Sequence, residues 1–125
     1  MRKQYHFRRV EADTYIWNVL HLVELSQNFK VKEISVSEIK ELHEAYWFPN
    51  LYPTTQQIIE HVQLINEADL TYPIILCAEG RVMDGMHRVA KAQLNKQDKI
   101  LAVQFEITPK PDFINVNEDQ LEYDD

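Results

Sequence analysis

The chain has 125 residues, 45 % of them hydrophobic, and a formal net charge of −7. This length fits one domain with its own core, and the apolar share excludes a chain that is disordered throughout. The negative balance disfavours a stand-alone nucleic-acid-binding protein, whose binding face is basic. Cys77 is the single cysteine, so no disulfide forms within the chain, and no apolar run approaches the ~20 residues that span a bilayer. Without a signal-peptide pattern either, the sequence predicts a cytoplasmic protein with no membrane partner.

Apolar spacing in the first third of the chain predicts helices. Over 13–27 the apolar residues recur at three- and four-residue steps, so we expect an N-terminal helix capped by its first residue. A short extended segment over 31–36 follows. Ser35 or Ser37 is then expected to begin a second helix that continues through Glu44.

The middle of the chain combines an aromatic loop with a third helix. Residues 46–53 form a proline-interrupted aromatic stretch, expected to be a wall of the core or, alternatively, a lid or base-stacking surface. Thr54 and Gln57 have capping-box spacing and open a helix to about Glu67. The residues expected to form its buried stripe are Ile58, Ile59, Val62 and Ile65.

The last third predicts the order strand, turn, strand, helix, strand. Residues 73–78 read as a strand buried on both faces, and a tight turn at 79–80 leads into a short partner strand over 81–83. A helix over 86–94 and a strand over 100–107 follow. With the earlier helices, this order predicts an α/β (α+β) fold, a small mixed sheet with helices packed on it.

We find no internal repeat, linker or composition shift, so residues 1–125 are expected to form a single domain. Residues 112–125 are expected to form an acidic C-terminal tail, since 117–125 hold five carboxylates and no base. A solvated, frayed end is the expected state of such a tail.

The motif Asp84-Gly85-Met86-His87-Arg88 lies where a strand is expected to end and a helix to begin. The first N–H groups of a helix have no partner within it and, with the helix dipole, attract anions. Gly85 lets a ligand approach the backbone. Arg88 can fork onto two phosphate oxygens, and His87 can donate a hydrogen bond or move a proton. The motif therefore predicts a phosphate-binding turn.

Each residue of the motif also has a structural interpretation. Asp84 is either the cap of the helix or a functional carboxylate, which holds Mg²⁺ against the phosphate or acts as a base. Gly85 supplies a positive φ angle in either case. In the structural interpretation, the ring of His87 only packs against its neighbours, and Arg88 only forms a salt bridge. It is their order between a strand and a helix that favours function.

The run over 72–92 resembles the core of the ParB/sulfiredoxin superfamily. Members of that superfamily carry a proline-led apolar strand, a glycine hairpin, an Asp-Gly-x-His-Arg or Gly-x-Arg-Arg turn and an alanine-rich helix. The stretch over 34–39 also resembles the family's opening strand and helix, so the likeness covers about residues 31–107. The resemblance implies a ParB/sulfiredoxin-like fold and a nucleotide, such as ATP, held at the turn. It places Gly85, Met86, His87 and Arg88 on the phosphates.

The resemblance leaves the activity open. ParB proteins bind and hydrolyse CTP, sulfiredoxins use ATP to repair oxidised cysteine, some members phosphorylate free serine, and others are described as nucleases. Met86 stands where sulfiredoxins have cysteine and where ParB proteins have the glutamate used in hydrolysis, which argues against both chemistries. The serine-phosphorylating members use an upstream glutamate, for which Glu33 and Glu38 are the candidates here. No helix-turn-helix region follows the motif.

Four functions are therefore compared. The first is a Mg²⁺-dependent phosphotransferase or nucleotide hydrolase, with Asp84, His87 and Glu38 as catalytic candidates and Asp84 as the metal ligand. The second is a module that senses a nucleotide without turning it over, which the inert Met86 favours. The third is a nuclease, against which the negative charge weighs. The fourth is a protein-interaction domain in which the motif only closes a turn.

Overall fold

The structure is a computed structural model and describes residues 4–122. Its first element is a hairpin of β1 (Tyr5–Val10) and β2 (Asp13–Asn18), paired along their whole length. The helix predicted over 13–27 is therefore wrong in its first six residues, and α1 spans only Val19–Ser26. Residues 13–18 form a strand for two reasons. They are rich in aromatic and β-branched residues, which favour strands, and their backbone groups pair with β1. Asn18 caps α1 by accepting a hydrogen bond from Leu20 N at 3.0 Å.

The extended segment predicted over 31–36 is confirmed as β3 (Lys32–Ser35). The helix expected from Ser35 or Ser37 to Glu44 is wrong, because the chain there makes two 3₁₀ turns, η1 (Val36–Glu38) and η2 (Lys40–His43). The side chain of Ser35 makes no capping hydrogen bond. The extended backbone at Ile39 ends the first turn and directs its side chain into the core.

The central element is a four-stranded sheet with the order β3-β6-β4-β5. It confirms the strand-turn-strand-helix-strand prediction, with β4 (Ile74–Leu76), β5 (Val82–Asp84), α3 (Met86–Leu94) and β6 (Lys99–Gln104). Strands β4 and β6 are parallel, and the other pairs are antiparallel, so the sheet is mixed as expected. Together with the separate three-stranded sheet β1-β2-β7, it makes the fold an α+β fold.

Both faces of the central sheet are buried, which explains why β4 is apolar without alternation. Its first residue, Ile74, faces α3 and η1, whereas Ile75 faces α1 and the hairpin. The first face adds Val36, Ile39, Leu76, Val82, Met86, Val89, Ala92, Ile100 and Ala102, and the second adds Trp17, Leu22, Cys77, Met83, Val103 and Phe105.

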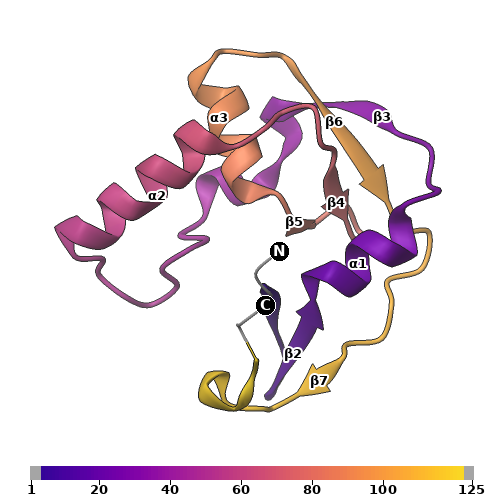
Figure 1. The fold of residues 1–125 in the computed structure, drawn as a ribbon, viewed down its shortest axis with the longest axis vertical. Helices are drawn as coiled ribbons and strands as arrows, with labels where there is room; N and C mark the ends of the chain where they lie inside the picture. The colour runs from indigo at the N-terminus through magenta and orange to yellow at the C-terminus, as the bar shows by residue number, and fades with distance from the viewer. Residues whose placement is uncertain (1–3, 123–125) are drawn as a thin grey trace.

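Helix α2 (Thr55–Glu67) extends away from the sheet at the left of Figure 1. Its predicted capping box is confirmed: Thr54 Oγ1 accepts from Gln57 N at 3.1 Å, and Gln57 Oε1 accepts from Thr54 N at 2.9 Å. The predicted buried stripe is wrong, since no residue of α2 is buried. The helix is amphipathic but packs mainly against α3, so Ile58, Ile59 and Val62 remain between 48 % and 53 % exposed.

The acidic tail predicted over 112–125 contains two short elements in the part that the structure describes. Strand β7 (Phe113–Ile114) pairs with β2, and a 3₁₀ turn, η3 (Glu118–Gln120), follows it. Leu121 is buried, whereas residues 117–120 and 122 are exposed, as expected for a solvated acidic segment. Residues 123–125 lie outside the described residues. Among residues 4–122, no helix is both long and apolar enough to cross a bilayer.

Candidate functional site

The predicted motif lies at the junction of β5 and α3, as the sequence indicated. Asp84 ends β5, and Gly85 is the N-cap of α3 with φ +104°. Asp84 is therefore not the helix cap, and no side chain caps the first turn of α3. The N–H groups of Met86, His87 and Arg88 are the donors that a helix leaves without an internal partner. This junction has the geometry of an anion-binding helix start.

Gly85 is required by its backbone and by its neighbours. Its positive φ is rare for residues with a side chain. A Cβ there would also lie 2.7 Å from Cγ2 of Ile74 and 2.8 Å from Nη2 of Arg88. The space that glycine leaves is thus used by Arg88 and by the core, and not by an approaching ligand as the sequence suggested.

Arg88 folds back under the turn. Its Nη2 donates to Oδ2 of Asp84 at 2.7 Å, and its Nη1 donates to the carbonyls of Tyr72 and Pro73 at 3.2 and 3.1 Å. The side chains of this pair are only 16 % and 19 % exposed, for Arg88 and Asp84 respectively. Arg88 therefore joins the start of β4 to the end of β5, and only its remaining N–H groups can reach a ligand.

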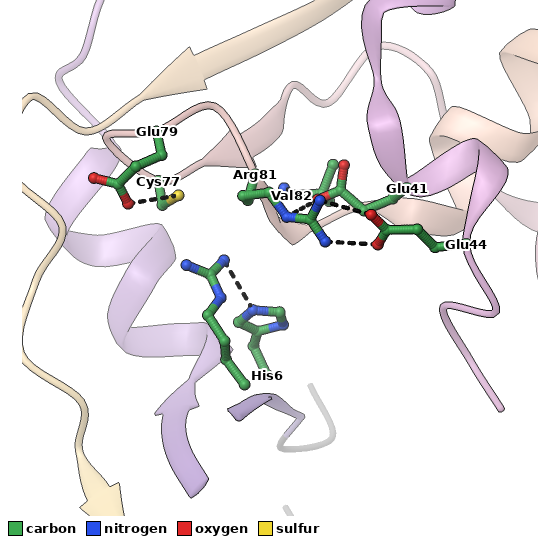
Figure 2. Close-up of polar contacts among 8 residues, drawn as sticks. His6, Glu41, Glu44, Cys77, Glu79, Arg81 and Val82 are labelled. Carbon is green, nitrogen blue, oxygen red and sulfur yellow. Dashed lines mark hydrogen bonds and ion pairs between the residues drawn. The ribbon is translucent and has the colours of Figure 1, made fainter. Parts of the chain in front are cut away.

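A second carboxylate, which the sequence analysis did not identify, holds β5 in place. The side chain of Glu41 is 2 % exposed, and its Oε2 accepts from Val82 N at 2.6 Å and lies 3.4 Å from Nε of Arg81. Arg81 also forks onto Glu44, with distances of 2.8 and 2.6 Å. Figure 2 shows Arg81 reaching both glutamates. This network fixes the strand that presents Asp84, two residues further on.

His87 forms a cluster with two residues that are distant in sequence. Its Nε2 lies 2.8 Å from Nδ1 of His61 on α2, at hydrogen-bond distance. The indole of Trp47 stacks on both rings, with centroid distances of 4.5 Å to His61 and 4.6 Å to His87. The edge of Phe48 also contacts His61. The aromatic loop over 46–53 thus covers an imidazole pair beside the motif.

Both imidazoles of this pair are neutral at pH 7. Burial lowers the pKa of His87 to about 4, and the neighbouring His61 contributes to the change. Burial also lowers the pKa of His61, against a smaller opposing effect of Glu60. His87 is therefore not the second cation that the motif suggested, and the permanent positive charge of the turn belongs to Arg88 alone.

Two depressions adjoin the turn and share Asp84, Gly85 and His87 in their walls. The smaller, about 280 Å³, is the more charged, because Glu67, Asp69, Asp84 and Arg88 line it. The larger, about 470 Å³, is mainly aromatic and apolar, and its lining includes Tyr5, His6, Tyr46, Trp47, Met83 and Met86. Residues of β1, which lie outside the resemblance, therefore form one wall of the site.

Two further candidates are placed differently from the turn. Met86 is mostly buried in the core and borders the larger depression, so it offers the turn a backbone N–H and no reactive side chain. Glu38 is exposed in η1 and lines another depression, with Arg81 and Gln104. No interaction between Glu38 and the turn is found among residues 4–122, and Glu33 lies in β3 opposite Leu101.

No protein-family model matches the chain, and neither curated proteins nor solved structures give a match. The residues that the structure describes contain no group of three or more His, Cys, Asp or Glu side chains arranged to hold a metal ion.

Proposed function

We propose that the junction of β5 and α3 binds the phosphate groups of a nucleotide. The observation that carries this proposal is the start of α3, which no side chain caps and which borders two adjoining depressions. The smaller depression borders the uncapped N–H groups at the start of α3, which favour phosphates, and the larger one, with Tyr46 and Trp47 in its wall, suits a base and sugar. The resemblance of the run over 72–92 to the ParB/sulfiredoxin superfamily implies the same ligand.

Binding without turnover is the form of this function that the site supports best. Met86 brings no reactive side chain to the turn, and Glu38 lines a different depression. A Mg²⁺-dependent phosphotransferase or hydrolase is the second candidate. The carboxylate of Asp84 beside the helix start favours it, since carboxylates and phosphates together bind Mg²⁺.

The binding test is a thermal-shift series with ATP, ADP, CTP and GTP, with and without Mg²⁺. A ligand at 100 times its Kd adds about 2.7 kcal/mol of stability. Arg88 also joins β4 to β5, so replacing it with alanine could unfold the protein. Arg88→Lys is the better variant, because it keeps the positive charge and loses the two-pronged hydrogen bonding of the guanidinium. Arg81→Lys is the matched control, since it loses a forked contact to Glu44 away from the turn. The proposal requires a nucleotide shift that Arg88→Lys reduces and Arg81→Lys retains.

Asp84→Asn separates the two forms of the function. A binding module should hold the nucleotide as tightly or more tightly, because the variant removes a carboxylate that repels phosphate. An enzyme that uses Asp84 should lose Mg²⁺-dependent product formation. If none of the four nucleotides raises the melting temperature of the wild type, the proposed function is wrong.

A further inference from the structure

The side-chain charges around the turn, unlike the N–H groups at the start of α3, are unfavourable for a phosphate. Three carboxylates line the charged depression, from Glu67, Asp69 and Asp84, against the single guanidinium of Arg88. That guanidinium already lies 2.7 Å from Oδ2 of Asp84. A dianionic phosphate therefore enters a site with net negative charge, and its binding needs another positive charge.

The groups that can supply this charge lie next to the turn. His61 faces His87 from α2, and Glu60 is the charged residue beside His61. From β1, His6 lies across the larger depression, but it is buried and contacts Arg8 at 3.3 Å. Arg8 makes His6 an unfavourable place for a further proton.

Tyr46, from the loop that packs over the site, is also unsuited to supply charge. Burial raises its pKa to about 12, with a contribution from Glu41, so it stays neutral. The imidazole pair is therefore the group in the described site whose pKa a bound phosphate can raise toward neutral pH.

We propose that His61 and His87 act as one unit that takes up a proton when a phosphate group binds at the start of α3. This inference rests on the proposed function. His61 is then a positioning residue: it holds the ring of His87 and shares its charge, while His87 lines the site itself.

The proton balance of this step is simple. In the neutral pair, one ring donates N–H to the other across the 2.8 Å contact, and the donor ring has a free lone pair on its outer nitrogen. The proton comes from solvent and binds to that outer nitrogen. The contact between the rings survives, because the donor keeps its N–H and the acceptor keeps its lone pair. The resulting imidazolium is stabilised by the indole of Trp47, which stacks on both rings.

The same contact links the ligand to α2. Apart from the imidazole pair, the polar contacts of α2 with α3 come from Lys91, whose Nζ donates to the carbonyls of Asn66 and Ala68 at 3.0 and 2.7 Å. Within residues 4–122, the imidazole contact and these two Lys91 contacts are the polar contacts found between the two helices. A charged hydrogen bond is stronger than a neutral one, so proton uptake should also tighten α2 against the site.

The test is a pH titration of the imidazole Cε1–H signals by NMR between pH 4.5 and 8. It is made on the full chain, without Mg²⁺, with and without the nucleotide that gives the largest thermal shift of the four. Opposite charge nearby raises a pKa by about 1 to 3 pH units, so the signals of His61 or His87 should titrate at a higher pH in the complex. His43, which is exposed in η2, is the internal control and should not change.

The variant His61→Gln keeps a side chain that can hydrogen-bond to His87 but cannot carry the proton. If the pKa of His87 rises from about 4 to about 6, proton uptake by the pair should by itself make wild-type affinity about ninefold higher at pH 5 than at pH 7, apart from the effect of the phosphate's own protonation. His61→Gln should reduce this pH dependence, and His43→Gln should retain it. A purely structural role of His61 would weaken binding equally at both pH values.

Three outcomes decide the inference. A higher pKa of the pair in the complex, with reduced pH dependence in His61→Gln, supports it. A nucleotide that shifts the amide signals of Met86, His87 and Arg88 without changing either imidazole pKa overturns the inference and leaves the proposed function standing. If no nucleotide shifts these amides at any pH, the proposed function fails first, and the inference fails with it.

Discussion

The buried carboxylate of Glu41 offers the sharpest test of the structure around the candidate site. Its Oε2 accepts from Val82 N at 2.6 Å and lies 3.4 Å from Nε of Arg81, while the side chain is 2 % exposed. Glu41→Ala therefore leaves a backbone donor and part of a guanidinium without their buried acceptor. Leaving the Val82 N–H buried without an acceptor costs about 1–3 kcal/mol, whereas Arg81, which is 39 % exposed, keeps its contact with Glu44.

This loss is large for a domain of 125 residues. Domains of this kind are stable by about 5–15 kcal/mol, and a loss of 3 kcal/mol lowers the melting temperature on the order of 10 °C. Urea unfolding followed by circular dichroism measures the change. Glu41→Gln keeps an acceptor oxygen and should cost about half as much or less, so it reports on the charge if Glu41→Ala fails to fold.

Glu44→Gln is the matched control for this prediction. Glu44 contacts the same arginine but is exposed, and exposed ion pairs contribute little. If Glu41→Ala and Glu44→Gln destabilise the protein equally, and by less than about 1 kcal/mol, then Glu41 does not hold β5 and the reasoning is refuted.

Four further predictions follow from single contacts. Gly85→Ala should cost about 2–3 kcal/mol, from its positive φ and the crowding by Ile74, and an unchanged unfolding midpoint would contradict this. Burial, and then Arg8, lower the pKa of His6 from 6.5 to about 3, so between these pH values the unfolded chain binds more protons than the folded one. The free energy of unfolding should therefore fall as pH decreases, by roughly 2 kcal/mol at pH 5. His6→Gln should make the free energy of unfolding depend less on pH in this range. Lys91→Met should speed hydrogen exchange in α2 and leave the central sheet unchanged, whereas uniform acceleration would mean that it destabilises the whole domain. Cys77, fully buried, should resist thiol reagents until the protein unfolds.

Local sequence signals determined the elements whose own residues suffice to form them. The capping box at Thr54 and Gln57 placed the start of α2 correctly, because both of its hydrogen bonds lie within four residues. The apolar run before the glycine turn identified β4 and β5, and Asp84 to Arg88 marked the junction with α3. These patterns are short-range, so the sequence states them directly.

Tertiary contacts decided the elements for which local preference and long-range pairing disagree. Residues 13–18 carry a helical apolar spacing, yet they form β2 because β1 and β7 supply backbone partners on both sides. The apolar residues of α2 suggested a buried helix, but burial depends on which surfaces meet, and α2 meets the body mainly through α3. Strand β7 was not predicted either, because its two residues become a strand only by pairing with β2.

The candidate site divides in the same way. The sequence by itself determined the glycine turn, the helix start and the presence of Arg88 and His87, since these follow one another along the chain. Only the tertiary structure brought His61, 26 residues before His87, to 2.8 Å from it, and only the tertiary structure placed the carbonyls of Tyr72 and Pro73 against Arg88. The physical reason is that the charge and hydrogen-bonding state of a side chain depend on the groups that surround it in space, and these come from α2, the aromatic loop and β1.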